Sequence, residues 1–281
     1  LVTGADGFIG RNVIERLKYA HNIEPIRFVR GDSPEILTHL IAKSDAIIHL
    51  AGENRPRNAE EFYEVNAGLT EKITQCLKDL YDNTGRQLPL VIASSTQVKL
   101  SNPYGKSKLA AEELVCRLNN KTKNPCTILR LPGVFGKWCK PNYNSVVATF
   151  CYNVARDLPI QISDPEIEIT LVHIDDVIDT ILNVISPYTQ DCNYASVDPK
   201  YKITLGELAK SIRSFKEFDD TLLLPAVGTG FVRKLYSTYI SYLPTERFSH
   251  KLVSHKDHRG TFVEMLKTHD CGQFSYFTAY P

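Results

Sequence analysis

The sequence has almost no net charge and no long apolar run. Lys and Arg number 33 against 32 Asp and Glu, so the formal charge is +1. No basic or acidic tail proposes nucleic acid or a membrane surface as the main partner. The longest apolar runs, such as residues 46–51, fall far short of the roughly 20 residues that a spanning helix needs. We therefore expect a cytoplasmic protein with no nucleic-acid or membrane partner.

Cysteine occurs without any recognisable spacing. The chain has 7 Cys, an odd number, and the closest pair along the sequence is Cys116 and Cys126. This pattern suggests neither a disulfide framework nor a CxxC metal site. We expect reduced, packed thiols and no metal site within this chain.

The two ends look incomplete. Leu1 stands just before Thr3-Gly4, where a nucleotide-binding strand usually supplies several apolar residues. Residues 262–267 and 274–278 alternate like the opening strands of a sheet that has too few strands to close. We expect the natural chain to continue at both ends.

What the chain does contain is an alternation of strand-like and helix-like segments. Amphipathic stretches of helical length separate short apolar runs, which is typical of βαβ units and of a parallel sheet covered on both faces. After Gly136 the rhythm loosens, although one more strand and two more helices are indicated. The expected strands are 26–29, 46–50, 90–93, 127–131 and 167–174, and the expected helices are 8–19, 62–81, 103–118, 146–156 and 175–185. The predicted fold class is α/β, a Rossmann-like doubly wound parallel sheet with a smaller lobe.

The first turn carries a glycine triplet, Thr3-Gly-Ala-Asp-Gly-Phe-Ile-Gly10. Gly4 allows the tight turn, Gly7 lets the backbone approach a pyrophosphate, and Gly10 allows the helix to pack closely on the strand. The helix N-terminus then faces the phosphates. Such a triplet is weak evidence alone, but its place between a strand and a helix predicts a dinucleotide site.

Arg30 follows the second strand, where an NAD-specific site would normally offer Asp or Glu to the ribose hydroxyls. A guanidinium matches a 2′-phosphate in geometry and charge, which favours NADP(H). Asp32 is close enough to leave NAD(H) open, and a solvated surface arginine is the plain alternative. His49-Leu-Ala-Gly52 is expected to close the fourth strand near the nicotinamide half, with His49 more often a satisfied polar residue than a catalyst.

The stretch from Asn102 to Lys108 contains a Tyr-x-x-x-Lys pair. With Asn102 as N-cap, Tyr104 and Lys108 should lie on one helical face. A phenol with a pKa of about 10 is a poor acid–base group at neutral pH, and a neighbouring ammonium favours the phenolate. That pair can deliver the proton of an alcohol while a hydride moves to the opposite atom. Ser94-Ser95 ends the preceding strand, where a hydroxyl could hold the substrate oxygen.

Taken together, these motifs resemble the extended short-chain dehydrogenase/reductases that act on nucleotide sugars. The segments 130–136 and 172–177 support the resemblance. It implies that Ser95 holds the substrate, that Tyr104 is the acid–base, and that Lys108 modulates it and binds the ribose. The cofactor-binding residues are then expected to be Gly4, Asp6, Gly7, Phe8, Ile9, Gly10, Arg30, Leu50, Ala51, Gly52, Asn66, Tyr104 and Lys108.

Within that superfamily, segments 135–145, 148–151 and 235–244 resemble the bifunctional enzymes of UDP-N-acetyl-L-fucosamine synthesis. The resemblance implies NADPH-dependent reduction of the C4 ketone of a UDP-2-acetamido-2,6-dideoxyhexulose in capsule or O-antigen sugar synthesis. It places a C3 epimerase in a zinc-containing cupin that follows the reductase, with zinc bound only beyond this chain. It also implies a homodimer or higher homo-oligomer. The implied domains are a reductase at 1–247, with a substrate lobe mainly at 137–160 and 187–247, and an incomplete cupin at 248–281.

Expected contacts to the UDP-sugar are made by Ser95, Asn142, Asn144 and His173. The two asparagines serve equally well as loop caps. Where many relatives have an asparagine in the sixth strand, this chain has Gly133, so one contact to the sugar or uridine is missing there.

Three alternatives stay open at this point. A 4,6-dehydratase usually needs carboxylates after its Ser/Thr, whereas this chain has Thr96 and Gln97. An NAD-dependent 4-epimerase keeps its cofactor bound. Arg30 favours an exchangeable NADPH instead, but it does not exclude the epimerase. A non-catalytic NAD(P)-sensing regulator has no need of the Tyr104/Lys108 pair.

Overall fold

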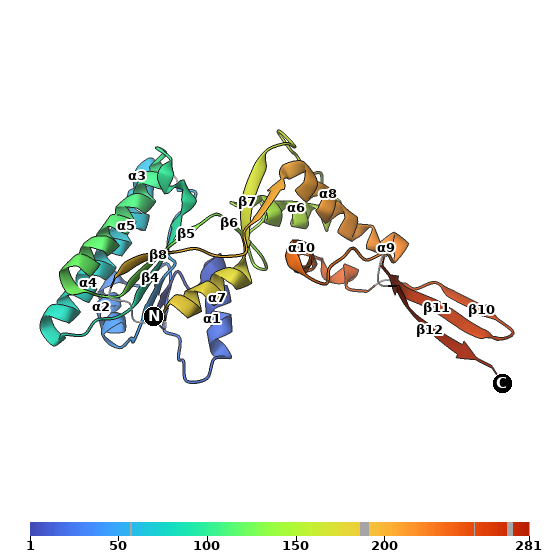
Figure 1. Ribbon diagram of the computed structural model, residues 1–281, viewed down its shortest axis with the longest axis horizontal. Coiled ribbons are helices and arrows are strands. Elements are labelled where there is room, and N and C mark those ends of the chain that lie inside the picture. The colour runs from blue at the N-terminus through green and yellow to red at the C-terminus, as the bar shows by residue number, and fades with distance from the viewer. Residues whose placement is uncertain (57, 186–190, 250, 269–271, 281) are drawn as a thin grey trace. The chain divides into compact units, whose positions relative to one another are not determined.

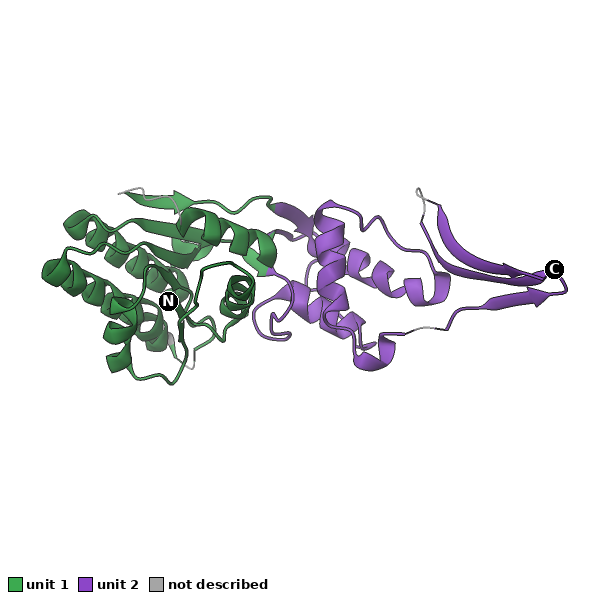
Figure 2. Cartoon of the chain, turned by 90° about the horizontal axis from the view of Figure 1, so that it is seen from below, with its two compact units in different colours: residues 1–134, 172–200 green, residues 135–171, 201–281 purple. Residues whose placement is uncertain are grey.

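A computed structural model describes residues 1–56, 58–185, 191–249, 251–268 and 272–280. The chain divides into two compact units, drawn in different colours in Figure 2. The first unit comprises Leu1–Val134 and Val172–Lys200, and the second comprises Phe135–Leu171 and Tyr201–Pro281. In the part of the chain described, no helix is long and apolar enough to cross a membrane.

The first unit is built on a six-stranded sheet in the order β2-β1-β3-β4-β5-β8. Every neighbouring pair in it is parallel. The chain order reverses at β1, between β2 and β3, which is where doubly wound sheets bind ligands. The strands are β1 (Val2–Thr3), β2 (Arg27–Phe28), β3 (Ile47–His49), β4 (Leu90–Ser95), β5 (Cys126–Leu131) and β8 (Cys192–Ala195).

Two apolar layers cover this sheet because successive strand residues point to opposite faces. Ile48, Val91 and Leu129 belong to the core under α1 and α7, whereas Ile47 and Leu90 belong to the core under α2, α4 and α5. Figure 1 shows the two groups of helices. The helices of this unit are α1 (Phe8–Lys18), α2 (Pro34–Ala42), α3 (Ala59–Tyr63), the π-helix η1 (Glu64–Gly68), α4 (Leu69–Thr84), the 3₁₀ turn η2 (Thr96–Lys99), α5 (Pro103–Thr122) and α7 (Ile174–Ile185). The Rossmann-like class is confirmed.

The second unit has its own core, formed where α6, α8 and α10 pack on a three-stranded sheet in the order β6-β7-β9. A further three-stranded antiparallel sheet follows in the order β10-β11-β12. The elements are β6 (Gly133–Phe135), α6 (Val146–Val154), β7 (Glu168–His173), β9 (Tyr201–Thr204), α8 (Leu205–Lys216), α9 (Phe218–Thr221), α10 (Gly230–Ile240), η3 (Thr245–Arg247), β10 (Ser254–Asp257), β11 (Gly260–Lys267) and β12 (Gln273–Ala279).

The structure differs from the sequence-based expectation in several places. Strand β8 lies in the stretch assigned to the substrate lobe, yet it pairs with β5 in the first unit's sheet. Strand β10, which contains His255, was not expected from the sequence. The expected helix 62–81 contains a π-helical segment, and His49 ends the third strand rather than the fourth. Strands β8 and β10 were missed because they contain no buried residue and lack apolar alternation. The predicted domain limits stay predictions.

Candidate active site

The loop between β1 and α1 has the shape of a phosphate cradle. Gly4 has a φ of +66°, and a Cβ there would lie 2.7 Å from the backbone nitrogen of Ala51. A Cβ on Gly10 would overlap the carbonyl oxygen of Gly4, so α1 packs on β1 more closely than a side chain allows. At Gly7, the N-cap of α1, a Cβ would meet only that same oxygen, at 3.1 Å. The fold therefore requires Gly4 and Gly10, whereas Gly7 leaves room for a phosphate at the helix N-terminus.

Four other predicted cofactor residues surround this loop. Phe8, Ile9 and Leu50 pack their side chains against the core of the first unit. Their side chains are therefore occupied, and the first turn of α1 offers backbone N–H groups to a ligand. Asp6 is exposed and forms an ion pair with Arg27 of β2.

Arg30 lies just beyond β2 with 81% of its side chain exposed. Its Nη2 donates to Oε2 of Glu53 at 2.7 Å, and the Glu53 carboxylate is buried. The other oxygen of Glu53 accepts hydrogen bonds from the next two backbone nitrogens, each at 2.9 Å. Asp32, the alternative ribose ligand, accepts from the backbone nitrogen of Val29 at 2.7 Å and so closes a turn. An exposed guanidinium can exchange its partner, and a phosphate would compete with Glu53 for it.

His49 is a buried structural brace. The Thr70 hydroxyl donates to the carbonyl oxygen of Asn66 at 2.7 Å, so it accepts from Nε2–H of His49 at 3.0 Å. The Nδ1 atom then accepts from the Thr3 hydroxyl at 2.7 Å. Burial, followed by the charge of Lys108, lowers the pKa of His49 to about 3. The ring is therefore neutral and both of its nitrogens are engaged, as expected for a satisfied polar residue.

Asn66 joins the loop after β3 to helix α5. Its Oδ1 accepts from the backbone nitrogen of Glu53 at 2.8 Å. Its Nδ2 donates to the Glu53 carbonyl at 3.2 Å and to the Ser107 hydroxyl at 3.0 Å. A Cβ on Gly52 would lie 2.9 Å from that Oδ1 and 3.0 Å from Nζ of Lys108. Gly52 therefore makes room for Lys108, and Asn66 shapes the loop through bonds within the protein.

The predicted catalytic residues lie together at the carboxyl end of β4. Asn102 caps α5 by accepting from a first-turn backbone nitrogen at 2.7 Å, which places Tyr104 in the first turn. Ser95, at the end of β4, lies close enough to the Tyr104 phenol to lower its pKa. One turn further along α5, Nζ of Lys108 donates to the carbonyl oxygen of Ala93 at 3.0 Å. This arrangement can hold a substrate carbonyl oxygen and hand it a proton.

The electrostatics of this group differ from the sequence-based expectation. Burial raises the pKa of Tyr104, and only the interaction with Ser95 opposes the rise. Burial also lowers the pKa of Lys108 to about 8, against the raising effect of Glu112. The phenol is therefore protonated at neutral pH, and stabilisation of the phenolate by Lys108 stays a prediction. Burial sets the direction of both pKa shifts, and the Lys108 ammonium donates to a backbone carbonyl.

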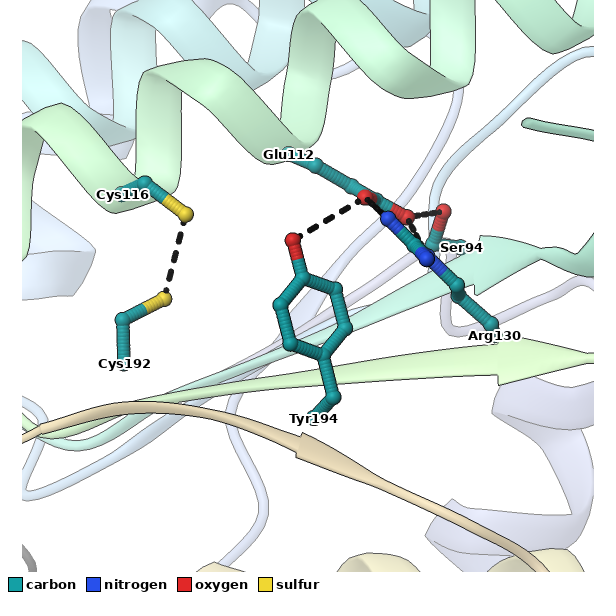
Figure 3. Close-up of polar contacts among 6 residues, drawn as sticks. All are labelled: Ser94, Glu112, Cys116, Arg130, Cys192 and Tyr194. Atoms are coloured by element: carbon teal, nitrogen blue, oxygen red, sulfur yellow. Dashed lines mark hydrogen bonds and ion pairs between the residues drawn. The ribbon is translucent and has the colours of Figure 1, made fainter. Parts of the chain in front are cut away.

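A buried carboxylate that the sequence did not single out lies beside these residues (Figure 3). Glu112 accepts from the Ser94 hydroxyl at 2.5 Å and from Arg130 Nη2 at 2.6 Å. The Tyr194 hydroxyl lies 3.4 Å from the same carboxylate. The sequence spacing could have indicated Glu112, because an acidic residue one helical turn after Lys108 falls on the helix face that also carries the catalytic lysine.

The predicted substrate residues are distributed over both units. His173, the last residue of β7, is buried and accepts from the backbone nitrogen of Asp175 at 3.4 Å. Asn142 and Asn144 are exposed in the loop before α6 in the second unit. Asn142 has a φ of +55° and donates its backbone N–H to Thr149. Their contacts to a nucleotide sugar stay predictions. Within the described ranges, no three His, Cys, Asp or Glu side chains cluster as metal ligands would.

Comparison with known proteins confirms the expected resemblance. The chain is 48% identical, over all 281 of its residues and 74% of the other protein, to the UDP-2-acetamido-2,6-beta-L-arabino-hexul-4-ose reductase of Pseudomonas aeruginosa. The capsular polysaccharide assembling protein CapF from Staphylococcus aureus superposes with a TM-score of 0.87 and 38% identity, over 100% of this chain and 75% of that one. A structure of CapF with the inhibitor 3-isopropenyl-tropolone gives a TM-score of 0.82 and 33% identity, over 100% and 73% of the two chains.

A model of one protein family matches residues 1–194, which include the glycine loop, the Ser95–Tyr104–Lys108 group and the parallel sheet that carries them. That range covers more than half of the chain. The chain therefore belongs to the NAD dependent epimerase/dehydratase family.

Proposed function

We propose that this protein reduces the C4 ketone of a UDP-2-acetamido-2,6-dideoxyhexulose with NADPH, in the synthesis of a capsule or O-antigen sugar. The observation that carries the proposal is the placement of Ser95 beside the Tyr104 phenol, with Lys108 one turn further along α5. The names of the Pseudomonas reductase and of CapF support the substrate class and the capsule setting. A cytoplasmic location and a homo-oligomeric state are parts of the proposal that rest on the sequence alone.

The chain's own residues account for the proton and for the orientation of the sugar. A reduced nicotinamide, when bound, supplies the hydride that a ketone carbon accepts. Ser95 holds the C4 oxygen, and Tyr104 donates its phenolic proton to that oxygen, so hydride plus proton turn the ketone into an alcohol. The raised pKa of Tyr104 suits a proton donor, because the phenol stays protonated at neutral pH. Lys108 stabilises the phenolate until solvent returns the proton.

The choice of NADPH rests on Arg30, whose exposed guanidinium can form charge-assisted hydrogen bonds with a 2′-phosphate. One observation favours a second candidate. The buried carboxylate of Glu53 already pairs with Arg30, and a carboxylate near the adenosine ribose is the usual NAD signature. The second candidate is therefore an NAD-dependent 4-epimerase acting on a UDP-sugar.

A turnover assay separates these candidates. The purified chain is incubated with NADPH or NADH and a UDP-2-acetamido-2,6-dideoxyhexul-4-ose, and loss of the reduced-nicotinamide absorbance is followed. We expect stoichiometric consumption, faster with NADPH. If an added UDP-hexose interconverts with its C4 epimer while no reduced cofactor is consumed, the reductase proposal fails.

A further inference from the structure

Glu112 connects helix α5 to three strands of the parallel sheet (Figure 3). Its side chain is only 1% exposed. It accepts from Ser94 on β4 at 2.5 Å and from both Nε and Nη2 of Arg130 on β5, the latter at 2.6 Å. The Tyr194 hydroxyl on β8 lies 3.4 Å away, and the Arg130 guanidinium stacks 4.4 Å from the centre of the Tyr194 ring. The carboxylate is therefore held in one place from several directions.

The anchored strand residues flank the catalytic ones. Ser94 and Ser95 are neighbours on β4 and point to opposite faces of the sheet. The bond from Ser94 to Glu112 thus fixes the strand end from which Ser95 reaches Tyr104. Ala93, the residue before Ser94, supplies the carbonyl oxygen that accepts from Lys108.

Stability alone is a poor explanation for this carboxylate. A buried ion pair pays a desolvation cost that its attraction often only balances, so apolar residues of similar volume would serve as well. What they would not supply is a negative charge one helical turn from Lys108, which is itself buried.

We propose that Glu112 is a positioning residue of the reductase, which keeps Lys108 charged and keeps Lys108 and Ser95 in register across α5 and β4. The inference rests on the function proposed above. Burial lowers the pKa of Lys108 to about 8, and Glu112 is the charge that opposes this. The other titratable or charged groups near Lys108 are His49 on β3, Tyr104 on α5 and Arg130, which is paired with Glu112. His49 is neutral because its pKa is lowered to about 3.

The test replaces the charge and keeps the shape. Glu112→Gln is compared with Glu113→Gln, which removes an exposed carboxylate from the adjacent position of the same helix. Two readouts are followed against pH, namely kcat/KM for the 4-ketosugar and the Kd of the reduced dinucleotide by fluorescence titration. In the parent chain both should weaken above the pKa of Lys108. We call this decline at high pH the alkaline limb. In Glu112→Gln we expect the alkaline limb to begin at a pH lower by about one unit or more, because an opposite charge within roughly 4–6 Å usually shifts a pKa by that much. Glu113→Gln should match the parent.

A second variant moves the limb in the opposite direction. Arg130→Gln removes the cation that offsets Glu112, so Lys108 should hold its proton to higher pH. This variant also serves if Glu112→Gln does not fold. If Glu112→Gln loses activity while the alkaline limbs of kcat/KM and of the dinucleotide Kd stay where they are, Glu112 has only a structural role. If the limb stays where it is in Arg130→Gln, the proposal is overturned as well. Failure of the parent chain to reduce any 4-ketosugar would refute the proposed function instead, while the dinucleotide Kd profiles would still test Glu112.

Discussion

Nζ of Lys108 donates a hydrogen bond to the carbonyl oxygen of Ala93, 3.0 Å away, and so joins the catalytic helix α5 to strand β4. The same nitrogen lies 3.0 Å from where a Cβ of Gly52 would stand. Lys108 is thus enclosed by the strand that carries Ser95 and the loop that follows β3. The surrounding strand and loop therefore hold the Lys108 ammonium in place, although its side chain is flexible.

Tyr104→Phe should abolish most turnover and leave dinucleotide affinity nearly intact. The phenol supplies the proton, and general acid catalysis is typically worth on the order of 10²–10⁴ in rate. Stopped assays of kcat and fluorescence titration of the cofactor measure the two effects. Tyr19→Phe, which changes an exposed tyrosine at the end of α1, is the control. More than half of the parental kcat in the Tyr104 variant would remove the tyrosine from the mechanism.

Arg30→Ala should raise the Kd for NADPH far more than that for NADH. A hydrogen bond to a charged group is worth roughly 1.5–3 kcal/mol, which corresponds to at least about a tenfold loss for NADPH. The matched control is Arg117→Ala, since Arg117 is exposed and pairs only loosely with Glu113, at 3.8 Å. Equal losses for the two cofactors would show that Arg30 does not read the 2′-phosphate.

Two glycines of the first loop should separate stability from binding. A Cβ on Gly10 would overlap the Gly4 carbonyl, so Gly10→Ala should lower the free energy of unfolding by about 1–3 kcal/mol. Gly7→Ala should change that free energy less and weaken dinucleotide binding, because it adds a side chain at the N-cap of α1, where the phosphate is expected. Urea titration and fluorescence measure the two quantities. Gly228→Ala, where a Cβ meets nothing within 4 Å, should alter neither. Equal stability losses at Gly7 and Gly10 would contradict this division.

The buried, neutral His49 should make stability fall with acid. Its folded pKa is lowered from 6.5 to about 3, so between these values the unfolded state binds a proton that the folded state refuses. The contribution is fully present above pH 6.5, and is lost as the pH falls toward 3, by up to about 1.4 kcal/mol per pH unit. Relative to His49→Gln, the parent's advantage in free energy of unfolding should shrink by roughly 2 kcal/mol between pH 6.5 and about pH 4.5. Replacing the exposed His21 by Gln is the control, and a constant parent-to-His49→Gln gap would mean that the ring is protonated in the fold.

Much of the first unit was predictable because its rules are local. The turn at Gly4 needs a positive φ, Gly10 needs a missing side chain, and Asn102 needs only its own helix to act as a cap. Such features depend on residues a few positions apart, and the strand–turn–helix pattern places them at the carboxyl edge of a parallel sheet. Ser95, Tyr104 and Lys108 meet there for the same reason.

Other features depend on long-range packing and escaped prediction. The Glu112 network joins residues of α5, β4, β5 and β8, which no spacing rule brings together. The edge strand β8 has no apolar alternation, so its place in the sheet of the first unit could not be predicted from the sequence. The pKa of Tyr104 was predicted from its charged neighbour, whereas the degree of burial, which only the folded structure shows, decides its direction.

Hydride transfer to C4 is the central claim, and an isotope experiment measures it directly. The chain is incubated with NADPH carrying deuterium at the transferable position and with a UDP-2-acetamido-2,6-dideoxyhexul-4-ose, and the product is examined by NMR and mass spectrometry. The account predicts a UDP-sugar alcohol with deuterium on C4 in the parent chain and almost no labelled product in Tyr104→Phe. A product without deuterium at C4, or label at another carbon, would contradict it.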